Sequence, residues 1–272
     1  MPLSAPAPAL LHKSAPAGPP AAQASPTAPE SLHPALWRAH QVGRAAHPVW
    51  ASGFAALDEQ LPGGGWPASA LTELLLPHPG VGELRLLAPV LVRLQNQQRS
   101  VMWFNPPAAP CPWALGALGL DMRQQFIVQS PPACGAAGQR APARTRVPAA
   151  DILWALEQAL KSGQLGAVLA WLPQRLPADA LRRLQLAAQL HEGPVFLLRA
   201  AEERSRASAA PLRLLLSSWG PDLLRVSIVK RRGAPLAEPR MLQLPAVLSA
   251  PALARALRGA PRSAVPQPSA AG

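Results

Sequence analysis

The stretch that decides the fold is residues 71–86, Leu71-Thr-Glu-Leu-Leu-Leu-Pro-His-Pro-Gly-Val-Gly-Glu-Leu-Arg-Leu86. An apolar run over 71–76 predicts a buried strand, and helical spacing of leucines predicts a helix over 83–97. A tight turn containing Gly80 and Gly82 lies between them. This order of strand, glycine-containing turn and helix is typical of a loop that binds phosphate through backbone N–H groups and the positive end of a helix.

The turn lacks the Lys-Ser/Thr pair that holds phosphates and Mg²⁺ in a working phosphate loop. Glu83 and Leu84 stand at those two positions, and a carboxylate repels a triphosphate. Two interpretations stay open on this evidence. The turn formed by Gly80, Gly82 and Glu83 is either a degenerate phosphate loop or an ordinary connection between a strand and a helix.

A second apolar strand, predicted at 166–172, shows a matching loss. Phosphate-loop ATPases carry an acidic residue at the end of such a strand, where it positions Mg²⁺. Trp171 occupies that position here and Leu172 follows it. Neither side chain can bind a hard cation, so the two losses together argue against ATP hydrolysis.

Patterns for other chemistry are also missing from the sequence. The six histidines lack the spacing of metal ligands. The two cysteines, Cys111 and Cys134, are too few for a disulfide framework. A Gly-x-Ser-x-Gly nucleophile motif is absent. We therefore predict a protein that is not an enzyme, with no catalytic residue, no bound metal and no cofactor.

Composition indicates a globular protein without a membrane anchor. The chain has 272 residues, of which 49% are hydrophobic, and its apolar runs stay well short of the roughly 18 to 20 residues that a membrane-spanning helix needs. Prolines interrupt the N-terminal region, which argues against a secretory signal. We therefore expect a cytoplasmic location and no membrane partner.

Positive charge is concentrated in the last quarter of the chain. The net charge is +12, and the residues from 199 onward contribute +8 of it, with twelve basic and four acidic residues. This clustering favours a basic surface that contacts nucleic acid phosphates or a partner. A solvated turn, and an arginine bias that comes from a GC-rich genome, are the alternatives. The candidate contacts are Arg199, Arg204, Arg206, Lys230, Arg231 and Arg232.

Alternating strands and helices followed by a β-meander predict an α/β fold. We expect a three-layer core with a mostly parallel sheet that ends in antiparallel strands. The predicted strands are 71–76, 101–104, 126–129, 166–172, 195–198, 212–216, 223–229 and 241–244, and the predicted helices are 83–97, 113–118, 151–161 and one that Pro177 opens. Residues 130–148 are predicted to form a loop.

Several short motifs occur in the order that they have in the RecA core, which the chain resembles. They are Ser52-Gly-Phe-x-x-Leu-Asp58, Leu61-Pro-Gly-Gly-Gly-Trp-Pro67, Leu71-Thr-Glu73, the glycine turn and Val229-Lys-Arg-Arg-Gly233. Four further motifs more closely resemble the ImuA family, the RecA-related, SulA-like proteins of bacterial mutagenesis operons. These are Leu36-Trp-Arg-Ala-His-Gln41, Ala170-Trp-Leu-Pro173, Leu181-Arg-Arg-Leu-Gln-Leu-Ala187 and Lys230-Arg-Arg-Gly233.

This resemblance covers about residues 32–246 and implies a domain organisation. A RecA-like domain is expected over 32–248. The helical spacing of Leu32, Leu36, Trp37 and His40 separately predicts a docking helix over 32–44 at its start. An Ala/Pro-rich segment over 1–31 is expected to be disordered, because it has too little apolar surface to offset chain entropy. A flexible basic tail is expected over 249–272.

The resemblance also implies a function. ImuA-type proteins are non-catalytic accessories in SOS-induced, error-prone translesion DNA synthesis. The implied partners are an ImuB-type homologue of Y-family polymerases and an error-prone polymerase III alpha-type subunit, with RecA and single-stranded DNA as further candidates. In active RecA proteins the turn that matches Lys230–Arg232 reaches nucleotide across the filament interface, and the loop that matches roughly 199–211 contacts DNA.

Two alternative functions stay open at this point. One is a divergent recombinase-type ATPase that uses an unconventional cation such as Arg85. The other is a SulA-like inhibitor of cell division, which would bind the division GTPase.

Overall fold

The computed structural model describes residues 48–129, 149–172, 176–177, 179–232, 238–247 and 251. All of them belong to one compact unit, Ala46–Gly272. The expected N-terminal disorder, the docking helix over 32–44 and the loop over 130–148 lie outside the described residues, as does the tail over 249–272 apart from residue 251.

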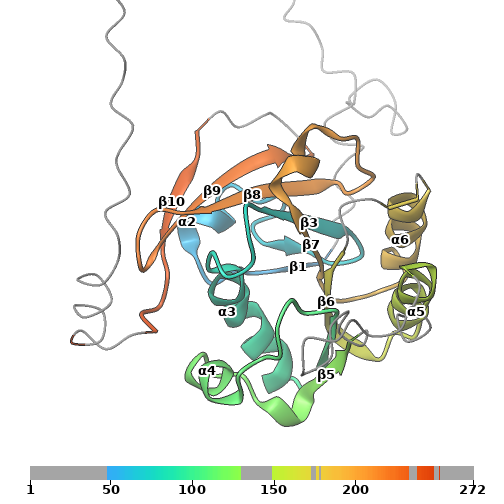
Figure 1. The fold of residues 1–272 in the computed structure, drawn as a ribbon, viewed down its shortest axis with the longest axis horizontal. Coiled ribbons are helices and arrows are strands. Elements are labelled where there is room, and N and C mark those ends of the chain that lie inside the picture. The colour runs from blue at the N-terminus through green and yellow to red at the C-terminus, as the bar shows by residue number, and fades with distance from the viewer. Residues whose placement is uncertain are drawn as a thin grey trace, which may run out of the picture. The chain divides into compact units, whose positions relative to one another are not determined.

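An eight-stranded sheet forms the middle of this unit (Figure 1). Its strands are β3 (Leu71–Leu76), β4 (Ser100–Phe104), β5 (Gln125–Val128), β6 (Leu165–Trp171), β7 (Val195–Ala200), β8 (Leu212–Ser218), β9 (Leu223–Lys230) and β10 (Arg240–Gln243). The order across the sheet is β10-β9-β8-β3-β7-β6-β4-β5. The part from β8 to β5 is parallel, whereas β9 and β10 are antiparallel. The predicted α/β fold with a mostly parallel sheet is confirmed.

Helices cover both faces of the parallel part of the sheet. The described helices are α2 (Ala55–Asp58), α3 (Glu83–Asn96), α4 (Pro112–Ala117), α5 (Ala149–Lys161) and α6 (Ala180–Ala188), with the 3₁₀ helices η2 (Met122–Gln124) and η4 (Ala201–Ser205); α2 contacts β10 at the antiparallel end. Helices α3 and α4 lie on one side of the sheet, and α5 and α6 lie on the other (Figure 1). A small antiparallel pair, β1 (Val49–Trp50) and β2 (Trp66–Pro67), precedes β3.

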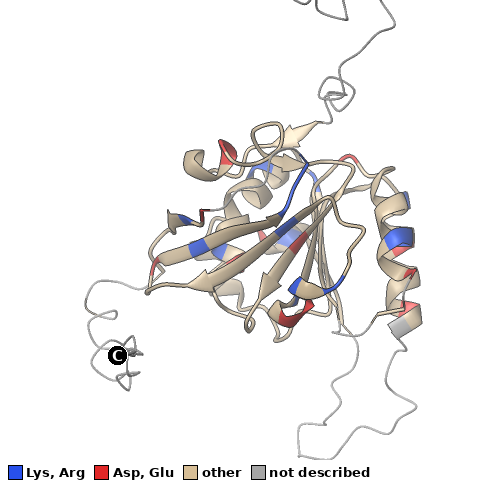
Figure 2. Ribbon diagram, turned by 90° about the horizontal axis from the view of Figure 1, so that it is seen from above, with Lys and Arg blue, Asp and Glu red and all other residues tan. Residues whose placement is uncertain are grey.

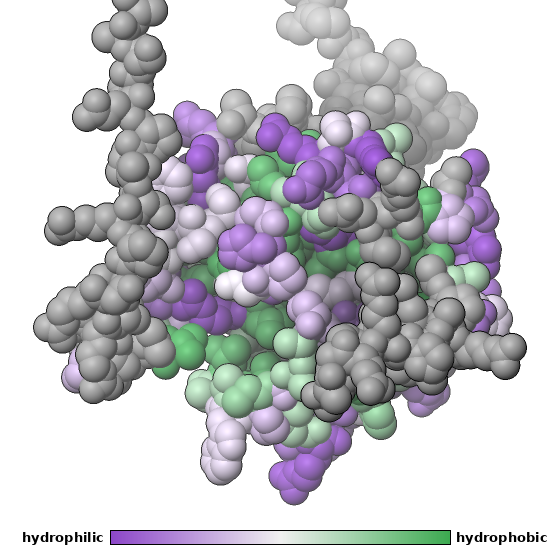
Figure 3. Space-filling view, in the orientation of Figure 1, coloured by the Kyte–Doolittle hydropathy of each residue, from purple (hydrophilic) through white to green (hydrophobic). Residues whose placement is uncertain are grey.

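The alternation of side chains along each strand builds two separate cores. On β3, Leu74 and Leu76 belong to the core beneath α3, and Leu71 belongs to the core beneath α5 and α6. In the first core, the rings of Trp66 and Phe196 meet edge to face with centroids 5.3 Å apart. Apolar surface remains exposed around α3 and α4 (Figure 3), and only Leu115 of α4 is buried.

The predicted elements within the described residues begin and end within two residues of their predicted bounds, with one exception. Pro177 does not open a helix: its carbonyl accepts a hydrogen bond from the N–H of Ala180 at 3.0 Å, and α6 begins only at Ala180. The sequence patterns also missed β1, β2 and α2. These elements have two to four residues each, which is too short for a hydrophobic period to show.

Candidate functional site

The turn between β3 and α3 depends on two glycines in the left-handed region. Gly80 has φ +88° and Gly82 has φ +116°, conformations that residues with a Cβ rarely adopt. Gly82 is also the N-cap of α3. The chain therefore leaves the buried strand β3, reverses sharply and enters α3 with the backbone N–H groups of the turn pointing inward.

The carboxylate of Glu83 occupies the centre of this turn. Its Oε1 accepts a hydrogen bond from the N–H of Gly80 at 2.8 Å, and its Oε2 accepts one from the N–H of Gly82 at 3.1 Å. Glu83 is buried, with 3% of its surface exposed. N–H groups at such a turn are the ones that a bound phosphate uses in a phosphate loop. Here the protein's own carboxylate takes them, and its charge is favourable at the N-terminus of a helix.

Arg85, the cation that the recombinase alternative would use, is held by the antiparallel end of the sheet. Its Nη1 donates to Asp222 Oδ1 at 2.7 Å and to the carbonyl of Pro245 at 3.2 Å. Its Nη2 donates to the carbonyl of Pro221 at 2.7 Å. Arg85 therefore ties the start of α3 to the β8–β9 turn and to the segment that follows β10.

Leu244 packs directly against the glycine turn. A Cβ at position 82 would lie only 2.8 Å from the Cδ1 atom of Leu244. The absence of a side chain at Gly82 thus serves packing as well as backbone conformation.

Trp171, at the position expected for the second acid, is part of the apolar packing. It is the last residue of β6, and β7 lies between β6 and β3. Its ring stacks on that of Trp103, with centroids 5.6 Å apart and an interplanar angle of 24°. Both rings pack in the core beneath α3. The end of β6 therefore carries an indole ring that stacks on a tryptophan of β4.

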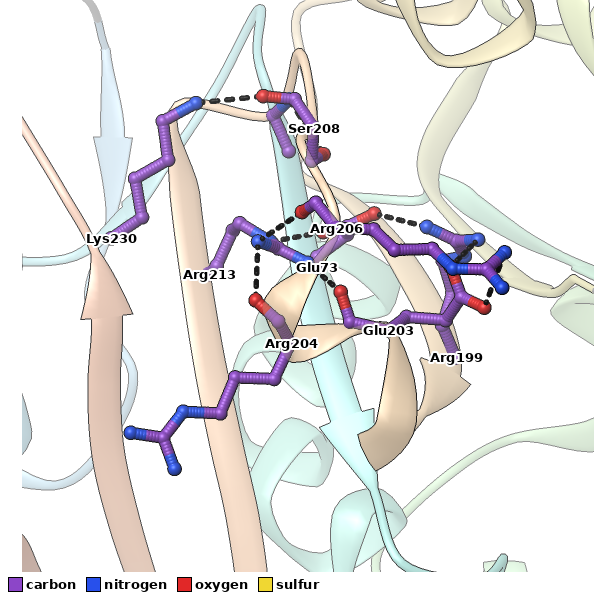
Figure 4. Close-up of polar contacts among 9 residues, drawn as sticks. Glu73, Arg199, Glu203, Arg204, Arg206, Ser208, Arg213 and Lys230 are labelled. Carbon is purple, nitrogen blue, oxygen red and sulfur yellow. Dashed lines mark hydrogen bonds and ion pairs between the residues drawn. The ribbon is translucent and has the colours of Figure 1, made fainter. Parts of the chain in front are cut away.

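Arg199, a predicted surface contact, is instead buried in an ionic cluster (Figure 4). Its Nη1 donates to Glu73 Oε1 at 3.0 Å and its Nη2 donates to Glu203 Oε2 at 2.8 Å. Arg213 donates through Nε to the other oxygen of Glu73. Two buried carboxylates thus neutralise two buried guanidinium groups. We refer to these four residues as the Glu73 cluster, and Arg199 is corrected from a candidate partner contact to a member of it.

The Glu73 cluster also fixes the backbone of η4 (Figure 4). Arg213 donates to the carbonyls of Glu203 at 2.7 Å, Arg204 at 3.3 Å and Arg206 at 3.0 Å. The side chains of Arg204 and Arg206 are exposed, although Arg206 also forms an ion pair with Glu203 at 3.3 Å. The cluster therefore positions two surface arginines from beneath.

The three cations after β9 differ in their surroundings. Lys230 is exposed, and its Nζ donates to the carbonyl of Ser208 at 2.8 Å. Arg231 is half-buried and donates to the carbonyl of Gln60 at 2.7 Å. Arg232 is exposed. The bond from Lys230 to Ser208 brings the end of β9 beside the loop that follows η4, so the two predicted groups of cations adjoin at the surface (Figure 4).

Glu73 lies on β3, well inside the sheet, and it accepts hydrogen bonds from Arg199 and Arg213. The role of Arg213 was missed. A charged residue inside an apolar run indicates a buried ion pair, and Glu73 and Arg213 each stand inside such a run.

None of the described helices is both long and apolar enough to cross a membrane. In the part of the chain that the structure describes, the His, Cys, Asp and Glu residues form no group that could hold a metal ion.

Comparison with known proteins gives one partial likeness. No protein-family model matches the chain. The cell division inhibitor SulA of Edwardsiella piscicida is 32% identical over 126 residues, which cover 46% of this chain. The match covers 64% of that relative, so the chain spans less than two thirds of the relative's length. This chain is therefore SulA-like over part of its length.

Proposed function

We propose that this protein is a non-hydrolytic, RecA-like accessory protein of the SOS response, and that it acts by binding partners. One observation carries the proposal: the Glu83 carboxylate accepts hydrogen bonds from the backbone N–H groups of Gly80 and Gly82. A nucleotide phosphate would have to displace a buried, hydrogen-bonded anion. The aromatic pair of Trp171 and Trp103 gives independent support, since it stands where Mg²⁺ would need a carboxylate.

Two features support a RecA-like description of the core. A mostly parallel sheet lies between helices, and the glycine turn follows a central strand, β3. In open α/β sheets, ligands bind at the carboxyl ends of the strands, and both the turn and Trp171 lie at that edge. The fold therefore keeps the framework of a nucleotide site while its functional groups are replaced.

The finer role that we propose is that of an ImuA-type accessory in error-prone translesion synthesis. The short motifs quoted above support it, and the likeness to SulA supports an SOS-related setting. The proposed protein partners are an ImuB-type polymerase homologue and an error-prone polymerase III alpha-type subunit in the cytoplasm, and RecA is a further candidate. Co-purification of the tagged chain with these two polymerase-related proteins tests this role. Damage-induced mutation that is unchanged when the chain is deleted would contradict it.

We expect the purified chain to hydrolyse no ATP above background, with or without single-stranded DNA. Isothermal titration with Mg²⁺-ATP should likewise show no binding, because Glu83 fills the turn. The matched control is Glu83→Gln, which keeps the size of the side chain and removes its charge. The proposal would be contradicted if the wild type hydrolysed ATP and if Gly80→Ala or Gly82→Ala abolished this activity. That result would favour the recombinase-type ATPase.

Single-stranded DNA binding is a second proposed property of the surface formed by the adjoining cations. Replacing Arg204, Arg206 and Arg232 together with alanine should weaken binding, because each can neutralise a backbone phosphate. The slope of log K against log salt should also become shallower, by roughly 0.7 for each phosphate that is no longer neutralised. Fluorescence anisotropy with a labelled oligonucleotide, measured over a range of salt concentrations, checks both effects.

The control variant also removes three arginines, but from other parts of the surface. Arg93 on α3, Arg123 on η2 and Arg182 on α6 are also exposed, and their triple alanine variant should bind DNA nearly as the wild type does. Equal losses of affinity in the two triple variants would indicate a general charge effect and no localised DNA surface.

The second candidate function is inhibition of cell division, and the likeness to SulA of Edwardsiella piscicida favours it. On this alternative the chain would bind the division GTPase. Overproduction in a host cell separates the two: filamentous growth supports the division inhibitor, whereas a raised mutation rate after DNA damage supports the translesion accessory.

A further inference from the structure

The antiparallel end of the sheet has one face that the described helices leave uncovered. Alternation along β8, β9 and β10 places Leu214, Leu224, Val226 and Leu242 in the core beneath α3. The intervening residues face the other way. Farther along that same side of the sheet, α5 and α6 cover the parallel strands and η4 lies against β3 (Figure 1).

This outward face carries apolar side chains beside the polar residues Ser217, Arg225, Ser227 and Gln243. Antiparallel strands with one wet face normally alternate between apolar residues inside and polar residues outside. Here Leu215, Leu223 and Met241 face outward, and Leu223 and Met241 are exposed by 36% and 43%. The adjacent β8–β9 turn adds Trp219, which is 63% exposed. Clustered exposed apolar side chains of this kind mark interaction sites.

Arg225 is the cation at the centre of this face. It lies opposite Ser217 on β8 and opposite Met241 on β10, and its guanidinium carbon is 5.5 Å from the centroid of the Trp219 ring. Tryptophan and arginine are among the side chains most enriched at energetically dominant interface positions. We call Leu215, Trp219, Leu223, Arg225 and Met241 the outer hairpin face.

The charged residues on the three strands of this face are all of one sign. The strands β8, β9 and β10 contain arginine and lysine but neither aspartate nor glutamate (Figure 2). Asp222, in the neighbouring turn, is already paired with Arg85. A second copy of the chain packed symmetrically on this face would bring one Arg225 toward the other, which electrostatic repulsion disfavours. The face therefore suits a partner that carries carboxylates.

The edge of the sheet is a poorer docking place than the face. Strand β10 has only four residues, and Pro239 and Pro245 stand on either side of it. Short edge strands and flanking prolines limit the addition of a further strand. A helix laid on the face would instead extend the layer that α5 and α6 form over the parallel strands.

We propose that the outer hairpin face binds an amphipathic helix of a partner protein, and that an acidic side chain beside the apolar stripe of this helix pairs with Arg225. The inference rests on the proposed function in one respect, that the chain works by binding protein partners. The apolar stripe would cover Trp219, Leu223 and Met241, while the carboxylate would meet the guanidinium group that already lies against the indole ring.

The experiment uses two labelled synthetic peptides of about 15 residues. Both carry leucines at helical spacing; one has glutamates flanking the stripe and the other has lysines there. We expect the full chain to bind the glutamate peptide at least about tenfold more tightly than the lysine peptide. Trp219→Ala should weaken this binding by at least about tenfold, and Arg225→Glu should reverse the preference between the peptides.

The control is Trp113→Ala, which removes an equally large exposed side chain from α4 and should leave binding unchanged. Circular dichroism confirms that each variant is folded. Absence of binding to the wild type, equal binding of the two peptides, or an Arg225→Glu variant that keeps the original preference would overturn the inference. The inference would also be overturned if the wild type formed a dimer and Trp219→Ala dissociated it, because a second copy of the chain would then occupy the face. None of these outcomes affects the ATP and DNA experiments above.

Discussion

Replacing Glu73 with glutamine is expected to lower the free energy of unfolding by about 3 to 5 kcal/mol. Glu73 is fully buried, and its two oxygens accept hydrogen bonds from Arg199 and Arg213. The variant leaves two buried guanidinium groups with Glu203 as the remaining carboxylate of the cluster. Loss of one partner from a buried ion pair is strongly destabilising because the remaining charge stays desolvated. Urea denaturation followed by circular dichroism measures the effect.

Two further variants make this prediction specific. Arg206→Ala removes a partly exposed ion pair with Glu203 and should cost at most about 1 kcal/mol. The double variant of Glu73→Gln with Arg213→Met removes one charge of each sign, so it should be less destabilised than the sum of its single variants. Additive losses of stability, or a Glu73→Gln loss no larger than that of Arg206→Ala, would contradict a coupled buried cluster.

The Glu73 cluster shows why the local sequence misled the prediction for Arg199. The predicted strand ended at Leu198, so Arg199 was expected in a loop among other cations, whereas β7 continues to Ala200. Its partner Glu73 is 126 residues away in the sequence, and a local pattern contains no information about such a partner. Only the register between β3 and β7, in which Leu75 lies opposite Arg199, brings the two side chains together.

Elements with a strong hydrophobic period were predictable, because burial alone determines them. Strand β6 is an apolar run, β3 is one that only Thr72 and Glu73 interrupt, and the leucines of α3 recur at helical spacing. The order of strands across the sheet was not predictable in this way. It depends on connections, such as the placement of β7 between β3 and β6, that leave no local period in the sequence.

The glycine turn shows what sequence and structure each contribute to the candidate site. In the sequence, Glu83 and Leu84 stand at the positions of the Lys-Ser/Thr pair of a working phosphate loop, and repulsion of phosphate was the consequence that we drew from Glu83. The structure adds that the carboxylate folds back onto Gly80 and Gly82. The Glu83 carboxylate does more than take the place of a lysine. It accepts hydrogen bonds from backbone N–H groups that would otherwise need a ligand or water. The turn is thus stable without nucleotide, as the proposed function requires.

Acidification is the second change expected to have a large effect, and it acts through His191. This residue is fully buried shortly before β7, and both of its ring nitrogens lack a hydrogen-bond partner among the described residues. Burial, aided by the nearby charge of Arg99, lowers the pKa of His191 from 6.5 to about 4. The folded state therefore holds the ring neutral through a pH range in which the unfolded chain binds a proton.

The sign of the effect follows from this depressed pKa. Stability from the neutral ring is fully present above pH 6.5 and is lost progressively as the pH falls toward 4, by on the order of 3 kcal/mol. Urea titrations at several pH values measure the loss. His191→Phe should flatten the pH dependence over this range whatever its effect on absolute stability, and the exposed His78→Gln should leave it unchanged. Carboxylates also titrate near pH 4, so the contribution of His191 is the difference between the pH dependence of stability in these two variants. If stability changed equally with pH in both variants, the acid sensitivity would belong to other groups.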